Sequence, residues 1–245
     1  MGIAIRNVSF SYPGKDILKG IDMDIEDGDF AGITGSTGSG KTTLAYCLNG
    51  LIPHSIRGKF SGKVHVNGFD TTKEKISRLS RKVGFVFQDP DWQIFSLTVK
   101  DEVAFGLKNI GARDIDSKVM NALIMVELDG MEEMMPQNLS HGQKQKLCIA
   151  SVLAMDPDII VMDEPTSQLD YRSTMNVYGI LKKLNESGKT IIVIEHNTDL
   201  ISEYANRVFI LDNGTIIKEG SPKKVLSDRK LMEKLGIKIP WVYRK

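Results

Sequence analysis

The sequence has 245 residues, of which 41% are hydrophobic and 26% charged, ordinary values for one folded α/β domain or a domain with a smaller lobe. The formal net charge of +1 excludes a strong long-range attraction to nucleic acid or anionic lipid, so no nucleic acid is expected as a partner. The longest apolar stretch, Leu147 to Met155, is under half of the about 20 residues that a membrane-spanning helix needs, so the chain is not expected to cross a membrane by itself.

Alternating hydrophobic residues near the N-terminus predict antiparallel β-structure. The alternation changes parity near Arg6 and Asn7, which indicates a bulge at that point. A second alternating run covers residues 21–25. Further along, Asn67-Gly68 follows another alternating segment and is typical of a hairpin turn.

Residues 98–155 predict helices, and the segments after them predict a parallel sheet. Thr98 to Asp101 fits a capping box at a helix start. Residues 159–162 and 190–194 are apolar without alternation, as in strands that are buried on both faces of a parallel sheet. A helix is predicted between them at 172–185, and the order strand, helix, strand implies a right-handed crossover.

The segment "GSTGSGKTT" predicts a phosphate-binding loop. It fits GxxxxGK[ST] completely, and a predicted strand precedes it while a predicted helix follows it, as the motif requires. Glycines let the backbone N–H groups point at an anion, and the helix N-terminus adds a favourable dipole. We expect Lys41 to share the polyphosphate charge with a Mg²⁺ ion held by Thr42. The expected nucleotide-binding residues here are Gly35, Ser36, Thr37, Gly38, Ser39, Gly40, Lys41, Thr42 and Thr43.

Polar side chains at the ends of other predicted strands are further candidates. Asp163 and Glu164 follow an apolar strand, and the carboxyl ends of parallel strands face the ligand crevice. Asp163 suits indirect Mg²⁺ coordination, and Glu164 suits polarising a water for attack on the γ-phosphate. His196 follows the neighbouring strand and is expected near the same phosphate. Taken alone, Gln88 is more simply a loop residue, and Tyr12 a packing residue that could also stack on a base.

The ordered set of motifs resembles the ATP-binding cassette (ABC) transporter ATPases over residues 3–220. The resemblance implies a P-loop NTPase core of the α/β class with a parallel sheet, an antiparallel β subdomain and an inserted α-helical subdomain. The matching positions are Tyr12 (A-loop), Gly35 to Thr43 (P-loop), Gln88 (Q-loop), Leu139 to Gln143 (the LSGGQ signature, here "LSHGQ"), Ile159 to Glu164 (Walker B and catalytic glutamate), Ser167 to Asp170 (D-loop) and His196 (switch histidine).

The resemblance also implies the domain limits and the role of each site residue. Residues 1–220 would form the nucleotide-binding domain, with the helical subdomain at about 90–155, and residues 221–245 a C-terminal extension. ATP and Mg²⁺ are the implied cofactors. The implied catalytic residues are Glu164, His196 and Gln88, the implied Mg²⁺ ligands Thr42, Gln88 and Asp163, and the further nucleotide contacts Tyr12, Ser140, Gly142, Gln143 and Asp170.

Ser140 is a natural N-cap, and small residues at a helix start make an anion site. In the family, such a site is completed by the P-loop of a second cassette, so a head-to-tail dimer with the same or a homologous chain is implied. His141 stands where the family has glycine, at a point of close approach. A substitution that points aside and a pH-sensitive contact are both open at this position.

A narrower resemblance lies in "FQDPDWQIFSLTVKDEVAFG", Phe87 to Gly106, which is similar to the energy-coupling factor (ECF) ATPases of cobalt, nickel and vitamin importers. It implies an integral membrane coupling subunit, a substrate-binding membrane subunit, and a peripheral position at the cytoplasmic face of the cell membrane. The tail Ile237 to Lys245 is expected to pack on its own domain, and a dimer or partner contact is the second interpretation.

Other classes of function fit the sequence less well. Soluble cassette ATPases of DNA repair or chromosome structure carry long coiled coils between P-loop and signature, and no long heptad run occurs between Thr43 and Leu139. Translation-factor-like cassettes normally come as two in one chain, and this sequence has one P-loop. Glu164 and His196 argue against a non-hydrolysing ATP switch. Among transporters, the motor of an exporter or of a polar-nutrient importer stays the main alternative.

Overall fold

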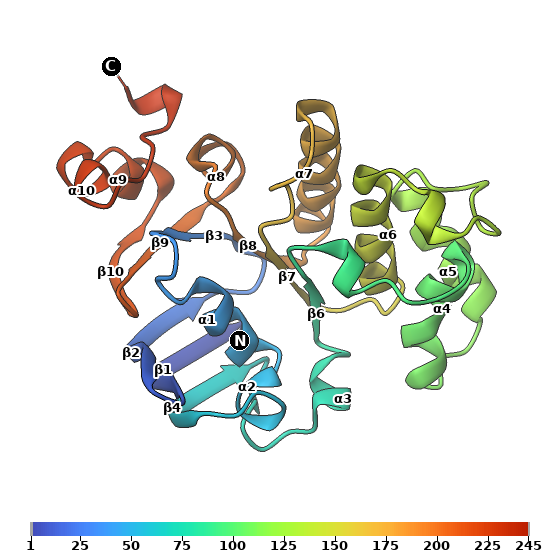
Figure 1. Ribbon diagram of the computed structural model, residues 1–245, viewed down its shortest axis with the longest axis horizontal. Helices are drawn as coiled ribbons and strands as arrows, with labels where there is room; N and C mark the ends of the chain where they lie inside the picture. Colours follow the sequence, from blue (N-terminus) through green and yellow to red (C-terminus); the bar gives the residue numbers. More distant parts are fainter. Residues whose placement is uncertain (1, 245) are drawn as a thin grey trace.

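Two β-sheets form the framework of the computed structural model, which describes residues 2–244 (Figure 1). The four-stranded antiparallel sheet has the order β2-β1-β4-β5. The six-stranded sheet has the order β10-β9-β3-β8-β7-β6, and all its strands run parallel except β10. The strands are β1 (Ile3–Tyr12), β2 (Lys15–Ile25), β3 (Phe30–Gly35), β4 (Lys59–Val66), β5 (Phe69–Asp70), β6 (Val83–Val86), β7 (Ile159–Asp163), β8 (Thr190–Ile194), β9 (Arg207–Asp212) and β10 (Thr215–Gly220).

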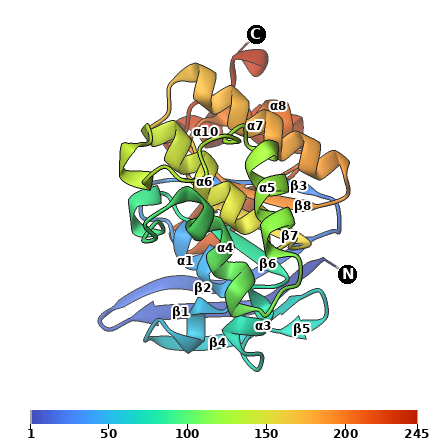
Figure 2. The ribbon, with the colours of Figure 1, turned by 90° about the vertical axis from the view of Figure 1, so that its right-hand side faces the viewer.

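Helices lie on both faces of the six-stranded sheet, and the antiparallel sheet packs on one of these faces as well. Figure 2 shows the antiparallel sheet at one end of the molecule and α7 with the C-terminal helices at the other. The helices are α1 (Lys41–Leu48), α2 (Leu51–His54), α3 (Ile76–Leu79), α4 (Val99–Asn109), α5 (Ile115–Met125), α6 (His141–Leu153), α7 (Tyr171–Glu186), α8 (Thr198–Tyr204), α9 (Pro222–Leu226) and α10 (Arg229–Lys234), with 3₁₀ turns η1 (Pro90–Trp92), η2 (Pro136–Asn138) and η3 (Trp241–Tyr243).

The expected bulge in the first strand is present. The register between β1 and β2 shifts between Ile5 and Val8, and Asn7 adopts a left-handed φ of 48°. The extra residue lets Ile5 and Val8 both point into the core, where each is fully buried. The hairpin turn at Asn67-Gly68 also forms, between β4 and β5.

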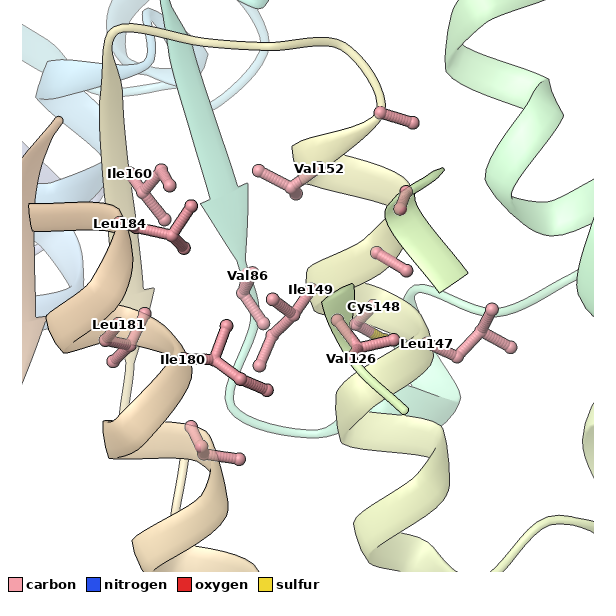
Figure 3. Close-up of a cluster of buried hydrophobic side chains, with 14 of the residues drawn as sticks. Val86, Val126, Leu147, Cys148, Ile149, Val152, Ile160, Ile180, Leu181 and Leu184 are labelled. Carbon is pink, nitrogen blue, oxygen red and sulfur yellow. The ribbon is translucent and has the colours of Figure 1, made fainter. Parts of the chain in front are cut away.

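The strands predicted to be buried on both faces are β7 and β8. Along β7, Ile159 and Val161 face the core between the two sheets, where α1 packs, whereas Ile160 and Met162 face the opposite core. Figure 3 shows the second core, in which side chains of α6 and α7 gather around Val86 and Ile160. The parallel sheet, the antiparallel sheet and the helical part of the predicted fold are therefore confirmed.

The helical part contains α4, α5 and α6, which pack on one another. Thr98 caps α4, because its hydroxyl accepts a hydrogen bond from the Asp101 backbone at 3.1 Å, as the capping pattern predicted. Among residues 2–244, no helix has both the length and the apolar composition needed to cross a bilayer.

The C-terminal residues pack on the rest of the chain. Val225, Leu226 and Met232 form a small core with residues of α8 and β9. The tail continues across α8, where the Thr198 hydroxyl donates to the Lys238 carbonyl at 2.7 Å. The expected packing of the tail on its own domain is thus present, although Trp241 keeps 75% of its surface exposed. Met1 and Lys245, included in the predicted segments, lie outside the described residues.

Candidate functional site

The predicted phosphate loop joins β3 to α1. Gly35, Gly38 and Gly40 all have φ between 76° and 154°, a backbone region that other residues rarely adopt. A Cβ at Gly35 would come within 1.9 Å of the Leu211 carbonyl oxygen, so only glycine fits there. Gly40 is the N-cap of α1 and has no side chain with which to cap it. The first N–H groups of α1 are therefore oriented as an anion site.

Lys41, the first residue of α1, folds back over this loop. Its ammonium donates to the carbonyls of Gly35 at 3.2 Å and Ser36 at 3.0 Å. Burial lowers the pKa of Lys41, while the charges of Glu164 and Asp163 oppose this shift. A partly desolvated cation attracts an anion more strongly than a solvated one, so Lys41 suits phosphate binding.

Asp163 ends β7 and is almost fully buried, with 3% of its surface exposed. Burial raises the pKa of Asp163, and the nearby Thr42 hydroxyl opposes the rise. Its Oδ1 atom has no hydrogen-bond partner among the described residues. A buried carboxylate oxygen without a partner is costly, and a bound cation would satisfy it. The Asp163 carboxylate and the Thr42 hydroxyl together offer two hard oxygen ligands suited to Mg²⁺.

Within residues 2–244 there is no group of three or more His, Cys, Asp or Glu side chains placed to hold a metal ion. A cation at Asp163 and Thr42 would therefore take most of its ligands from a bound phosphate and from water. That is the usual situation of Mg²⁺ in nucleotide sites.

Gln88, Glu164 and His196 meet at the carboxyl edge of the sheet, although they lie far apart in the sequence. Each follows a different strand, and β6, β7 and β8 are neighbours. Gln88 Nε2 donates to Glu164 Oε2 at 2.9 Å, and His196 Nε2 lies 3.0 Å from Glu164 Oε1. Glu164 has a φ of 48°, a strained backbone that is typical of functional positions. Both carboxylate oxygens of Glu164 are thus oriented by predicted site residues.

Tyr12 lies at the end of β1, in the hairpin that leads to β2. Its ring packs edge to face on Phe10, with centroids 5.0 Å apart, and it is only partly buried. The packing contact that the simpler interpretation predicted is therefore present.

Ser140 begins α6 as a fully formed capping box. Its hydroxyl accepts from the Gln143 backbone at 3.2 Å, and the Gln143 side chain accepts from the Ser140 backbone at 2.9 Å. The sequence predicted the cap at Ser140, but not that the Gln143 side chain would accept from the Ser140 backbone. A Cβ at Gly142 would lie 3.0 Å from Ser173 Oγ of α7, so glycine allows close packing there. His141 is the first helical residue and is half-buried.

Asp170 caps α7, since its carboxylate accepts from the Ser173 backbone at 2.7 Å, and this bond lowers its pKa. Figure 1 shows α6 in the helical part, on the far side of β7 and β6 from α1. The helices α1 and α6, which begin at Lys41 and His141, therefore do not lie side by side within one chain.

Sequence reasoning missed one buried polar residue at this site. Glu195 lies directly before His196, is 4% exposed and accepts hydrogen bonds from three groups. A carboxylate at the end of an apolar strand was visible in the sequence, as it was at Asp163.

Known proteins similar to this chain identify its family. Residues 18–167 match the family model described as ABC transporter. A protein of Pyrococcus abyssi named as an ABC transporter ATP-binding protein is 44% identical over 97% of this chain and 87% of its own length. An energy-coupling factor transporter ATP-binding protein, EcfA, of Methanothermobacter thermautotrophicus is 37% identical over 97% of this chain and 76% of its own.

Two solved structures are also similar. CbiO1 from Clostridium perfringens, part of the ABC transporter complex CbiONQ, has a TM-score of 0.82 and 31% identity, covering 98% of this chain and 96% of that one. A dimeric ATP-binding cassette in a post-hydrolysis state, bound to ADP and Pi, has a TM-score of 0.79 and 29% identity, covering 90% and 98%. The phosphate loop, the three side chains that meet at the sheet edge and these matches lead to one conclusion: the chain belongs to the ABC transporter family, as an ATP-binding subunit that hydrolyses ATP.

Proposed function

We propose that this chain is the motor subunit of an ECF-type importer for cobalt, nickel or a vitamin, bound peripherally at the cytoplasmic face of the cell membrane. The observation that supports an active motor is the meeting of Gln88, Glu164 and His196 at the sheet edge that carries the phosphate loop. Similarity to EcfA and to CbiO1 supports the ECF assignment.

Hydrolysis would use Glu164 as the general base. The water oxygen forms a bond to the γ-phosphorus of ATP, the bond from that phosphorus to the bridging oxygen of ADP breaks, and the water proton passes to Glu164. Gln88 and His196, at 2.9 and 3.0 Å from the two carboxylate oxygens, would hold Glu164 in position. The base of ATP would stack on Tyr12, and its phosphates would lie on residues 35–43.

Mg²⁺ is the proposed cofactor, and Thr42, Gln88 and Asp163 would hold it. The unpartnered Oδ1 atom of Asp163 supports this assignment, since a bound cation would stabilise a buried carboxylate oxygen that has no hydrogen-bond partner. In the structure the Gln88 amide nitrogen donates to Glu164, so its amide oxygen is the atom that could serve the ion. When bound, Mg²⁺ neutralises negative charge on the phosphates.

A second cassette, either another copy or a homologous chain, would complete each ATP site in a head-to-tail dimer. Ser140 is exposed at the N-terminus of α6, and this helix start lies away from the phosphate loop of its own chain (Figure 1). In the proposed dimer, Ser140, Gly142, Gln143 and Asp170 would contact the ATP bound by the partner. The similar cassette that is dimeric with ADP and Pi supports this arrangement.

The membrane partner would dock on the segment from Phe87 to Gly106. Trp92 and Leu97 are 86% and 81% exposed, and the rings of Phe95 and Phe105 meet edge to face with centroids 4.5 Å apart. A groove of about 260 Å³ lies beside these rings. An exposed apolar surface next to a groove suits an apolar helix of an integral membrane coupling subunit. That subunit would in turn hold the substrate-binding membrane subunit.

The test is purification of the tagged chain from its native membranes in mild detergent, with identification of the proteins that accompany it. We expect a coupling subunit and a small membrane protein whose ligand names the transported solute. Leu97→Glu should lose both, whereas Ile217→Glu, a change at an exposed apolar residue of β10, should keep them. Recovery of soluble partners alone, or of two large membrane domains typical of an exporter, would contradict the importer assignment.

A further inference from the structure

The buried carboxylate of Glu195 joins two segments of the site. Its Oε1 atom accepts the backbone N–H of His196 at 2.8 Å and that of Asn197 at 3.0 Å. Its Oε2 atom accepts the hydroxyl of Thr166 at 2.7 Å. Thr166 belongs to the loop that follows Glu164, so one side chain holds the backbone next to His196 and the loop next to Glu164.

The charge of Glu195 is compensated by these neutral donors. Glu195 is 4% exposed, and within the described part of the chain it forms no ion pair. The hydroxyl of Tyr178 is also buried near Glu195, and it has no hydrogen-bond partner among the described residues. Burial raises the pKa of Tyr178 well above its ordinary value, and the negative charge of Glu195 raises it further.

Moving either the Thr166 loop or the backbone at His196 would cost free energy, because Glu195 would lose a hydrogen-bond donor. A buried carboxylate that loses a donor keeps the full cost of its desolvation, which exceeds the gain from an average hydrogen bond. Backbone hydrogen bonds connect the loop after Glu164: Ser167 N–H donates to the Glu164 carbonyl at 3.3 Å, and Leu169 N–H to the Thr166 carbonyl at 3.1 Å. A displacement at Thr166 would therefore be transmitted to Glu164.

We infer that Glu195 is a positioning residue that keeps the side chains of Glu164 and His196 at their contact distance of 3.0 Å during hydrolysis, by tying the Thr166 loop to the backbone of His196. The inference rests on the proposed roles of Glu164 and His196. It assigns to Glu195 no contact with ATP or with the attacking water.

The test compares Thr166→Val with Thr166→Ser in the full-length chain. Valine keeps the shape and removes the hydroxyl that Glu195 accepts, whereas serine keeps the hydroxyl. We expect Thr166→Val to lower kcat about tenfold, the loss of one hydrogen bond to a charged group, and Thr166→Ser to stay near wild type. The KM for ATP in the rate assay and the Kd for ADP by calorimetry should both stay unchanged, because neither substitution touches the phosphate loop.

Glu195 itself is tested by rescue and by a double-mutant cycle. Glu195→Gln keeps the acceptor for both backbone N–H groups and can donate to the Thr166 hydroxyl, so it should retain most of kcat, unlike Glu195→Ala. Thr166→Val should add little to the loss in Glu195→Ala, since the bond between them is already gone. If Glu195→Ala does not fold, the Thr166 pair still decides the question.

Glu164→Gln and His196→Ala distinguish the positioning role of Glu195 from the proposed hydrolytic roles of Glu164 and His196. If both are inactive while Thr166→Val turns over like wild type, the positioning role of Glu195 is overturned and the proposed chemistry stands. Equal loss in Thr166→Ser and Thr166→Val, or a fall in ADP affinity that matches the fall in kcat, would also overturn it. Full activity of Glu164→Gln and His196→Ala would instead refute the proposed hydrolytic roles, and with them the inference.

Discussion

Replacing Asp163 by asparagine should make the nucleotide-free protein more stable while it abolishes hydrolysis. Asp163 is buried at the end of β7, its Oδ1 atom has no partner among the described residues, and burial raises its pKa. A carboxyl with a raised folded-state pKa contributes stability that is fully present below its ordinary pKa and is lost as pH rises through the raised pKa. At neutral pH the ionised group therefore destabilises the fold.

Asparagine is nearly isosteric and has no charge, so this destabilisation should disappear. Asparagine still leaves a buried polar atom without a partner, so only the extra cost of the charge is removed, and a gain of about 1 kcal/mol is expected for Asp163→Asn. For a chain of this size, each kcal/mol corresponds to a rise in Tm of about 2–4 °C. The variant should also lose the part of the pH dependence of stability that comes from this carboxyl.

Thermal denaturation of the nucleotide-free protein between pH 5 and 8, together with phosphate release from Mg²⁺ and ATP, measures both effects. Asp129→Asn is the matched control, because it removes one carboxylate from an exposed position and should change the stability by no more than about 0.5 kcal/mol. A nucleotide-free Asp163→Asn variant that melts below wild type at neutral pH would refute the reasoning, as would retained hydrolysis.

Three further outcomes are expected from single substitutions. Gly35→Ala should destabilise the protein by about 3 kcal/mol or more in urea denaturation, since the new Cβ would lie 1.9 Å from the Leu211 carbonyl oxygen. Gly38→Ala is the control: it has open space around it and should cost only about 1–2 kcal/mol, because alanine disfavours the left-handed backbone. Ser140→Ala should lose the cap of α6 and about 1 kcal/mol, seen as a lower Tm, and an unchanged Tm would contradict the capping role. Glu164→Gln should bind ATP as wild type does but hydrolyse it at least about 100-fold more slowly, measured by phosphate release, and it should elute with ATP as a dimer in size-exclusion chromatography.

The features that the sequence predicted well depend on local patterns. The apolar runs of β7 and β8, the parity change near Asn7 and the cap at Thr98 are each set by the residues within one element. Their physical causes, side-chain period and satisfaction of backbone groups, act over a few residues. These predictions therefore needed no knowledge of the rest of the fold.

The contacts within the site could not be predicted in the same way. The hydrogen bond from Gln88 to Glu164 depends on β6 lying beside β7, an order that only tertiary pairing decides. The link from Glu195 to Thr166 likewise crosses between segments 29 residues apart. The position of His196 after an apolar strand and the family resemblance of Gln88 predicted both as site residues, but the distances came only from the structure. Glu195, which none of the recognised motifs includes, was missed.

The central claim is that each ATP site is shared between two chains, and mixing two inactive variants tests it most directly. Glu164→Gln keeps an intact signature, and Ser140→Arg keeps an intact hydrolytic glutamate. If the sites are shared, the heterodimer contains one complete site, and an equal mixture should recover roughly a quarter of the wild-type hydrolysis rate. If the mixture stays as inactive as either variant alone, while the wild-type chain turns over under the same conditions, each site is built within one chain and the account is wrong.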